Sequence, residues 1–314
     1  MAAYDRFSAI GAREDLTDVI YNISPTDTPI MSSIGKTKAT SVYHEWQTDS
    51  LAAATTANAL VEGATATEGT ITPTTRLGNY TQIVGKTVMV SGTLQASDLA
   101  GRKSEMAYQM AKASSEMKRD IETIITANQG QTAASTGNAR KLGSLLSYIK
   151  TNTSKNGTSV TGVDPTTLGV STRTDGTTRT FTETLLKTVI ASVFSSGGTP
   201  SALFVSPAQK QVVSGFTGLA AQRYQVPTNG QATILAGADL YQSDFGVLQI
   251  VPDRFMRTRD ALILDPEYAS LAYLRPFQTY DIARVGDADK KQILAELTLE
   301  VSNEAAHGGV FDLS

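Results

Sequence analysis

The feature that most constrains the fold of this chain is a long amphipathic pattern from Ser97 to Asn128. Apolar side chains recur there at steps of three and four residues, which places them on one face of an α-helix. A helix of this length would extend roughly 45 Å at about 1.5 Å per residue, whereas helices in globular proteins average about 11–12 residues. The face is thin and predicts a rod that lies across a sheet, although an ordinary long amphipathic helix is the simpler interpretation. It carries Leu99, Met106, Met110, Ala113, Met117, Ile121, Ile124 and Ile125.

The segment from Thr48 to Thr75 is dominated by Ala, Thr and Gly, with few large side chains beyond Leu51, Leu60, Val61 and Ile71. It cannot bury enough apolar surface to offset a cost of about 1–2 kcal/mol per residue for ordering its backbone. Two outcomes stay open: a disordered loop, or an extended arm that another molecule orders. The flanking strand patterns Val42–Trp46 and Tyr80–Val90 predict a long two-stranded finger with this segment at its tip.

Upstream of the finger, residues 1–12 carry little pattern and predict an arm. Acidic and apolar residues at Arg13–Asn22 predict a short helix. Pro29 can begin one more helical turn, because proline is favoured at the first helical position.

Between the long helix and the C-terminal part, we expect loops followed by an α/β module. Residues 129–180 are rich in Gly, Ser, Thr and Asn and predict surface loops, with a short helix at Leu142–Lys150. Thr180 and Glu183 predict a capping box ahead of an apolar helix that ends at Gly197. The remaining signals of the module, which spans 180–251, are a buried strand at Ala202–Val205, a helix cap at Ser206–Pro207, and strands at Leu240–Tyr241 and Val247–Val251.

The clearest strand signal lies near the C-terminus, where apolar and polar residues alternate up to Val301. A partner strand from Leu271 to Ile282 and a polar turn at Val285–Lys290 complete a hairpin, which we expect to lie antiparallel under the long helix. The predicted core face carries Ile293, Ala295, Leu297, Leu299 and Val301, and the face expected to be solvated carries Gln292, Glu296, Thr298 and Glu300.

Composition excludes several classes of function. The chain has 314 residues, a net charge of −3 and no Cys, so it has no disulfide, thiolate metal site or cysteine nucleophile. Charged residues make up 18%, below the usual share of roughly a quarter. There is no global electrostatic attraction to nucleic acid or anionic lipid. No apolar run is long enough to cross a membrane, and we expect a soluble chain made in a cytoplasm.

The sequence contains no convincing enzyme motif. The triplets Gly35–Thr37 and Gly85–Thr87 match the last three residues of a phosphate-binding loop, but both lack the glycine that this motif requires five positions earlier. A strand is therefore favoured for Gly85–Thr87. His44 and His307 are not spaced as a helical metal pair, and no G-x-S-x-G elbow occurs. A glycosidase pair can lie far apart in sequence, yet the acid pairs here are explained by a solvated turn and a solvated sheet face. These pairs are Asp287/Asp289 and Glu296/Glu300. We expect no catalysis, no cofactor and no metal.

The order of arm, finger, long helix, α/β module and long hairpin resembles the major capsid proteins of tailed bacteriophages, in particular a short-tailed branch. Encapsulins share this fold. The resemblance implies an α+β fold with an N-terminal arm, an extended β-hairpin loop, a long spine helix, a peripheral domain and an α/β axial domain. The segments that carry it are Glu14–Leu16, Pro25–Pro29, Glu45–Trp46, Glu62–Ala64, Asn79–Ile83, Gly286–Asp287 and Glu296–Val301.

The same resemblance implies a division of the chain into six parts. The arm covers residues 1–41, and the extended loop hairpin covers 42–90. The peripheral domain comprises 91–135 with the spine helix and 266–303 with the long hairpin. The axial domain covers 136–265, and residues 304–314 return to it.

The function implied is that of a catalytically silent shell protein. Copies would assemble as hexamers and pentamers into the icosahedral capsid around the double-stranded DNA genome of a tailed phage, after synthesis in the host bacterial cytoplasm. Scaffold, portal and cement proteins are further implied partners. Packaged DNA would be contacted weakly and without sequence specificity, because basic clusters are missing. The alternatives are an encapsulin-like nanocompartment and a tail or fibre component.

Two places are predicted to contact neighbouring subunits. Glu62 is an isolated acid near the finger tip, and we expect it to pair with a basic residue of an adjacent subunit. The turn Gly286–Lys290 is expected to meet its symmetry mates at a local three-fold. The full set of expected contact residues is Trp46, Glu62, Gly63, Asn79, Gly286, Asp287, Asp289 and Lys290.

Overall fold

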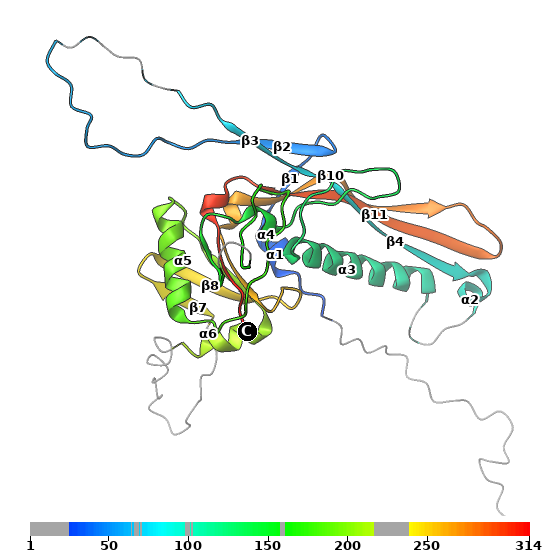
Figure 1. The fold of residues 1–314 in the computed structure, drawn as a ribbon. Coiled ribbons are helices and arrows are strands. Elements are labelled where there is room, and N and C mark those ends of the chain that lie inside the picture. The colour runs from blue at the N-terminus through cyan, green and yellow to red at the C-terminus, as the bar shows by residue number, and fades with distance from the viewer. Residues whose placement is uncertain are drawn as a thin grey trace, which may run out of the picture.

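The computed structural model describes residues 25–63, 65, 69, 71–97, 101, 103–157, 161–216 and 239–314. The predicted arm at 1–12 and the predicted helix Arg13–Asn22 lie outside the described residues. The body has two ends (Figure 1): a lobe built around a mixed sheet, and an elongated part in which one long helix runs beside a long hairpin. A two-stranded finger leaves the body above both of them.

The long helix is α3, Glu105–Thr126. The predicted apolar face is confirmed, since Met106, Ala113, Met117, Ile121 and Ile125 are buried. The predicted bounds were too wide at both ends. A separate short helix, α2 (Gly92–Ala96), ends at Ser97, whose backbone is extended. The Ser104 hydroxyl then caps α3 by accepting from Ala107 N, and the backbone is extended again at Ala127. Leu99 lies outside the described residues.

The long hairpin lies beside α3, and the packing of the two that was predicted is confirmed (Figure 1). Strands β10 (Ala269–Ile282) and β11 (Ala288–Val301) pair antiparallel, with Leu271 opposite Leu299 and Ile282 opposite Lys290. The sheet has the order β1-β10-β11-β4, with β1 at Gly35–Lys38 and β4 at Gln82–Ser91. The five residues of the predicted core face of β11 are at most 6% exposed.

The finger pairs differently from the prediction. Strand β2 (Tyr43–Thr48) pairs with β3 (Thr75–Tyr80), while β4 pairs with β11. The predicted strand Tyr80–Val90 is therefore divided at Thr81, and most of it belongs to the hairpin sheet. The reason is tertiary: β11 offers β4 a ten-residue ladder, which no local pattern reveals.

The polar face of β11 is covered in part, contrary to the prediction of a solvated face. Glu296 is 3% exposed and Thr298 is fully buried. The junction between β3 and β4 and the segment around Arg140 lie over this face and contact both side chains.

Residues 129–180 are not simply surface loops. The apolar residues of this segment enter the main core, where Leu142, Leu145, Leu146, Tyr148 and Ile149 are at most 1% exposed. The predicted short helix is reduced to α4, Leu145–Tyr148. The sequence did not predict the burial of these apolar residues because most of their neighbours in the segment are polar.

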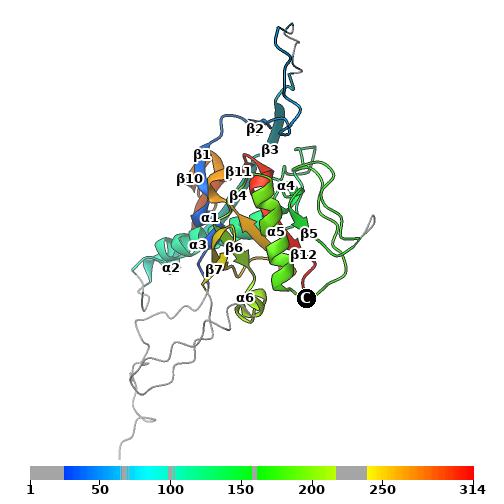
Figure 2. The same ribbon diagram turned by 90° about the vertical axis from the view of Figure 1, so that its left-hand side faces the viewer.

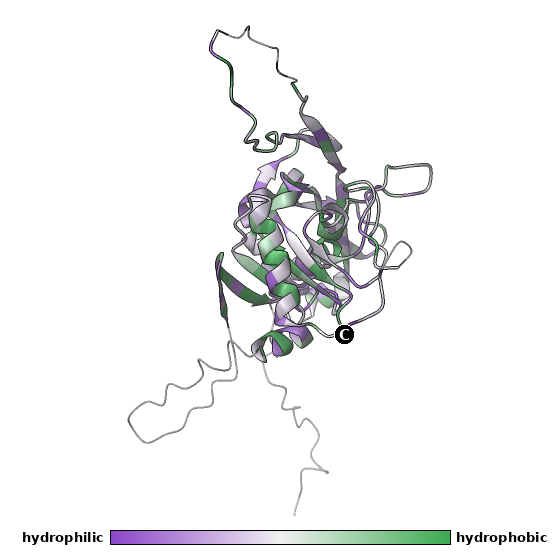
Figure 3. Ribbon diagram, turned by 60° about the vertical axis from the view of Figure 1, so that its left-hand side comes forward, coloured by the Kyte–Doolittle hydropathy of each residue, from purple (hydrophilic) through white to green (hydrophobic). Residues whose placement is uncertain are grey.

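The lobe contains a six-stranded sheet of order β5-β12-β9-β6-β8-β7. Figure 2 shows α5 (Glu183–Ser195) lying beside β5 and β12, and Figure 3 shows hydrophobic residues on α5 and on neighbouring strands. The strands are β5 (Thr153–Ser154), β6 (Ala202–Val205), β7 (Leu240–Ser243), β8 (Gly246–Pro252), β9 (Asp260–Leu264) and β12 (Gly308–Phe311).

Most local signals in this lobe are confirmed. Ser206 caps α6 (Pro207–Ser214), and the buried strand β6 lies where predicted. Gly197 follows α5 with φ +91°. The capping box was wrong, because Thr182 is the N-cap and its side chain makes no capping hydrogen bond. The module also needs strands beyond residue 251, since β9 lies between β6 and β12.

The described residues also form two one-turn 3₁₀ helices, η1 (Pro266–Tyr268) and η2 (Glu304–Ala306), and the short helix α1 (Pro29–Ser33). The turn predicted at Pro29 is thereby confirmed. None of the helices in the described part of the chain is long and apolar enough to span a bilayer.

Candidate functional surfaces

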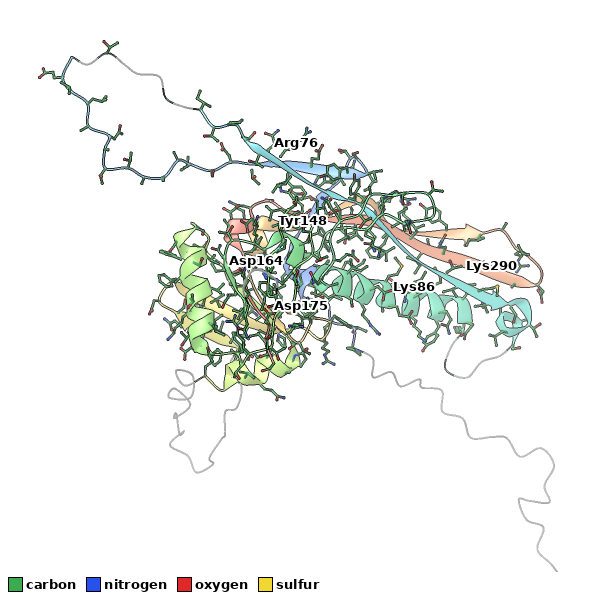
Figure 4. All side chains as sticks on the ribbon, in the orientation of Figure 1. Arg76, Lys86, Tyr148, Asp164, Asp175 and Lys290 are labelled. Carbon is green, nitrogen blue, oxygen red and sulfur yellow. The ribbon has the colours of Figure 1, made fainter. Side chains whose placement is uncertain are left out.

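The loop between β2 and β3 exposes large apolar side chains. Leu51, Leu60, Val61 and Ile71 are 99%, 86%, 79% and 92% exposed. The described residues of 49–74 form no helix or strand, and Figure 4 shows their side chains projecting away from the body. Full burial of one such side chain is worth about 1.5–3 kcal/mol. Exposed apolar groups on a projecting segment are typical of a binding surface.

The tip of this loop carries Glu62 and Gly63. Both are exposed, and Gly63 has φ +78°, a conformation that favours glycine. Among the described residues, Glu62 has no ion-pair partner. Its predicted role at a subunit contact stays a prediction.

The turn at the end of the long hairpin is the second predicted contact. Gly286 turns the chain with φ +77°, and Val285 beside it is 72% exposed. Gly92 N donates to Asp287 O at 3.1 Å, which ties the turn to α2. Asp289 pairs with Arg284 of its own chain, and this hydrogen bond lowers the pKa of Asp289.

A groove of about 650 Å³ separates the start of α3 from the outer half of the hairpin. Its lining is partly apolar and partly charged. The charged residues include Lys291 and Asp281, which pair at 3.0 Å. Lys290 also lines it and, in the part of the chain that is described, forms no ion pair; Figure 4 labels it near the hairpin end. The apolar lining comes from Met106, Ala107, Met110 and Ile282.

Two of the predicted contact residues lie inside their own chain. Asn79 is fully buried and its amide is bonded to Gly143 and Leu299, which leaves no surface for a neighbour to contact. Trp46 is half-buried and packs on Tyr148, with ring centroids 5.9 Å apart. The structure therefore brings Trp46 and Asn79 together at the root of the finger, away from Glu62 and the hairpin turn.

The polar cluster at that root was missed in the sequence. It joins the segment Gly78–Gln82 to Glu296, Thr298 and Arg140. No sequence signal separates a polar strand face that water covers from one that another segment covers.

A second missed residue is Glu122 on α3. It is fully buried, and its two carboxyl oxygens accept from Ile30 N at 2.7 Å and Met31 N at 2.9 Å. Burial raises its pKa to about 7, and the nearby Asp253 acts in the same direction. Glu122 thus attaches α1 to the long helix.

The histidines have structural surroundings, as predicted. His44 Nε2 lies 2.9 Å from Glu300, and both side chains are 17% exposed. His307 is buried; its Nδ1 accepts from Asp265 N at 3.2 Å, and burial lowers its pKa. The glycine triplets at Gly35 and Gly85 lie in strands β1 and β4. Within the described residues, no group of three or more His, Asp or Glu could hold a metal ion.

Comparison with known proteins gives one curated relative and many solved structures. The major capsid protein of Escherichia phage Phieco32 is 39% identical over 122 residues, which is 39% of this chain and 35% of that relative's length. The capsid asymmetric unit of cyanophage A-1(L) has a TM-score of 0.70 at 13% identity, covering 96% of this chain and 97% of that one. A chain from Microbacterium phage Oxtober96 has a TM-score of 0.63 at 12% identity, covering 99% of both.

The structural likeness shows the fold, which is the α+β fold of phage capsid proteins. The family model described as SU10 major capsid protein matches residues 3–314. That match spans nearly the whole sequence, and the chain therefore belongs to the SU10 major capsid protein family.

Proposed function

We propose that this chain is the subunit of the icosahedral shell that encloses the double-stranded DNA of a tailed bacteriophage, and that it has no catalytic activity. The observation that carries the proposal is the loop at 49–74, whose four large apolar side chains are at least 79% exposed. In a closed shell, each copy contacts several others. Modest contacts then add up to a stable assembly.

The partner surface that suits the loop is the groove between α3 and the hairpin of an adjacent copy. Apolar loop residues such as Leu60 would pack on Met106 and Met110. The segment 49–75 contains acids but neither Lys nor Arg. Lys290, at the rim of the groove, is a basic residue of the kind that Glu62 requires.

The finger, narrowed to β2 and β3, is the extended loop of the shell subunit in this proposal. The rest follows the predicted division: the arm at 1–41, the peripheral domain with α3 and the hairpin, the axial domain at 136–265 and its C-terminal return at 304–314. Hexamers and pentamers of the chain, scaffold, portal and cement proteins are the proposed partners. A net charge of −3 suits a wall that confines DNA without gripping it. Synthesis in the bacterial host and residence in the virion complete the proposal.

The test is electron microscopy of the purified protein. Closed shells of one size are expected. Tubes or isolated trimers would instead identify a tail or fibre component, and shells that enclose a protein cargo would identify a nanocompartment.

The loop's role is tested by replacing Leu60 and Val61 together with Ser. We expect shell yield to fall at least tenfold, because the substitution removes the exposed apolar groups. The melting temperature of the unassembled subunit should not change, since neither side chain packs on the body. Val170→Ser, at an apolar residue 50% exposed on the body, is the matched control. Normal shells from the double variant would contradict the proposal.

A further inference from the structure

Strand β3 of the finger joins the body through five residues, Gly78–Gln82, which we call the finger joint; strand β2 adds the contact of His44 with Glu300 and the packing of Trp46 on Tyr148. Strand β3 ends at Tyr80 and β4 begins at Gln82, so Thr81 interrupts the ladder. Thr81 N donates to Val42 O at 2.8 Å, which holds the break against the start of β2. A break in a ladder leaves backbone groups that must find other partners.

Backbone groups of the joint find those partners in the body. Tyr148 hydroxyl donates to Gly78 O at 3.1 Å. Tyr80 N donates to the Gln131 side chain at 3.2 Å, and Tyr80 O accepts from the Thr298 hydroxyl at 2.9 Å. Arg140 Nε donates to Thr81 O at 2.7 Å.

The side chains of Asn79, Thr81 and Gln82 are also hydrogen-bonded to the body. Asn79 Nδ2 donates to Leu299 O at 2.8 Å and to Gly143 O at 3.1 Å, and Gly143 N donates to Asn79 Oδ1 at 2.7 Å. Gln82 Oε1 accepts from Leu142 N at 3.2 Å. Each of the five residues is therefore hydrogen-bonded to the body, and Asn79 and Thr81 are fully buried.

Glu296 is the charged centre of this arrangement. It is 3% exposed and accepts from the Thr81 hydroxyl at 2.8 Å, from Arg275 Nε at 2.8 Å and from Arg140. The two guanidinium groups balance its charge, which a buried carboxylate requires. Thr298 on the same strand is also fully buried.

Hydrogen bonds can hold the finger in one orientation here, which an apolar contact cannot do. Hydrophobic packing is non-directional and lets a projecting hairpin pivot, whereas hydrogen bonds demand one geometry. Moving the joint would leave several buried donors and acceptors unpaired at once.

We propose that the finger joint fixes the direction in which the finger leaves the body, with Asn79, Thr81 and Thr298 as positioning residues. Freedom of the finger is then confined to the loop at 49–74, whose described residues form neither helix nor strand. The joint thereby fixes the position of the base of that loop relative to the body of the same chain.

The test measures the direction of the finger by double electron–electron resonance. The chain contains no Cys, so two introduced cysteines are the only labelling sites. One spin label replaces exposed Thr75 at the outer end of β3, and the other replaces exposed Thr188 on α5. A second pair has its outer label at Ala57 in the loop. Labelled subunits are diluted into unlabelled ones.

The expected result is a narrow distance distribution from Thr75 and one at least twofold wider from Ala57. Equal widths would overturn the proposal before any variant is made. Substitution of Thr81 and Thr298 by Val, which removes two hydroxyls at similar volume, should widen the Thr75 distribution at least twofold. Arg76→Ala is the control, because its pair with Glu45 lies within the finger, 3.1 Å apart and exposed.

An unchanged width in the folded double-Val variant would also overturn the proposal. If that variant fails to fold, Arg140→Lys replaces it, since lysine cannot bond Thr81 O and Glu296 as a fork. The same widening is expected there, and its absence would contradict the role of the joint.

The size of assembled shells gives a second test, which rests on the proposed function. Shells from the double-Val variant should vary in size under the electron microscope, and uniform shells from a variant with a widened distribution would refute the link between joint and assembly. If the wild-type protein forms no shells, the proposed function fails while the distance measurement still decides the proposal about the joint.

Discussion

At the scale of single residues, the informative side chains are polar groups that the fold has removed from water. Glu122, Asn79 and Glu296 lie between 0% and 3% exposed. Each joins segments far apart in the sequence: Glu122 holds Ile30 and Met31, and Asn79 bonds Leu299. A buried polar group is costly unless it is bonded, so these residues select one arrangement of their neighbours.

The first prediction concerns Glu122 and pH. Its pKa in the folded chain, about 7, lies above the ordinary value of 4.5. Between these values the folded chain binds the proton more tightly than the unfolded chain. The free energy of unfolding therefore falls as pH rises through this window, by at most about 3 kcal/mol.

Glu122→Gln should remove this part of the pH dependence. Thermal unfolding at pH 5.0 and pH 7.5 measures it, and the drop between the two should be smaller in the variant than in the wild type. Burial raises the pKa of Asp260 to about 6 and lowers the pKa of His307, so both also shape the pH dependence of stability. The comparison therefore uses the difference between the wild type and the variant. Asp49→Asn, an exposed acid in the loop, is the control. Equal drops in wild type and Glu122→Gln would contradict the prediction.

The second prediction concerns an ion pair. Arg173 is 1% exposed at its side chain and pairs with Asp164 while stacking on the Phe311 ring, 3.4 Å from its centroid. Arg173→Met leaves Asp164 with only Lys155 as an ion-pair partner among the described residues. We expect a loss of about 3–5 kcal/mol in the free energy of unfolding, measured by urea denaturation. Arg76→Ala, at an exposed pair, should cost less than about 1 kcal/mol.

At the scale of elements, α3 and the hairpin sheet form one unit. The helix packs on β4 and β11 through its apolar face, and Lys86 of β4 pairs with Glu116 and Asp120 of the helix at 3.0 and 3.1 Å. These pairs are about a third to a half exposed and contribute little by themselves. The apolar face therefore supplies most of the attachment.

The third prediction follows from that face. Met117 is fully buried, and Lys118, the next residue, is exposed. Met117→Ala should lower the free energy of unfolding by about 2–5 kcal/mol because it leaves a cavity under the helix. Lys118→Ala should change it by less than about 0.5 kcal/mol. Similar effects of the two substitutions, measured by urea denaturation, would show that the helix face does not carry the attachment.

At the scale of the whole molecule, the chain separates a self-sufficient body from a finger that lacks a core. The body has two apolar clusters, one under α3 and the hairpin and one around α5 in the lobe. The described residues of the loop at 49–74 belong to neither cluster, and the loop sequence contains acids but no Lys or Arg. The loop would therefore become ordered by packing against another copy of the chain.

The fourth prediction concerns Glu62 in the assembled shell. Glu62→Ala should lower the salt concentration at which shells dissociate, because one exposed pair is worth about 0–1 kcal/mol but recurs at every copy. Light scattering across a salt series measures it. The melting temperature of the unassembled subunit is the internal control. Unchanged salt resistance would show that Glu62 has no partner of consequence.

The sequence by itself determined the elements whose signal is local. The three- and four-residue periodicity placed the buried face of α3, alternation placed the core face of β11, and Ser206 marked the start of α6. Each of these depends on residues within a few positions of one another. The composition of 49–74 likewise determined that this segment could not fold by its own burial.

The tertiary structure alone decided which segments meet. It placed β4 beside β11 instead of β2, and it buried Glu296 and Thr298, whose alternating pattern is the same whether water or protein covers the face. It also carried the few apolar residues of 129–180 into the core. Pairing and burial of this kind depend on contacts between residues far apart in the sequence, such as Asn79 and Leu299, which are 220 positions apart, and no local pattern records them.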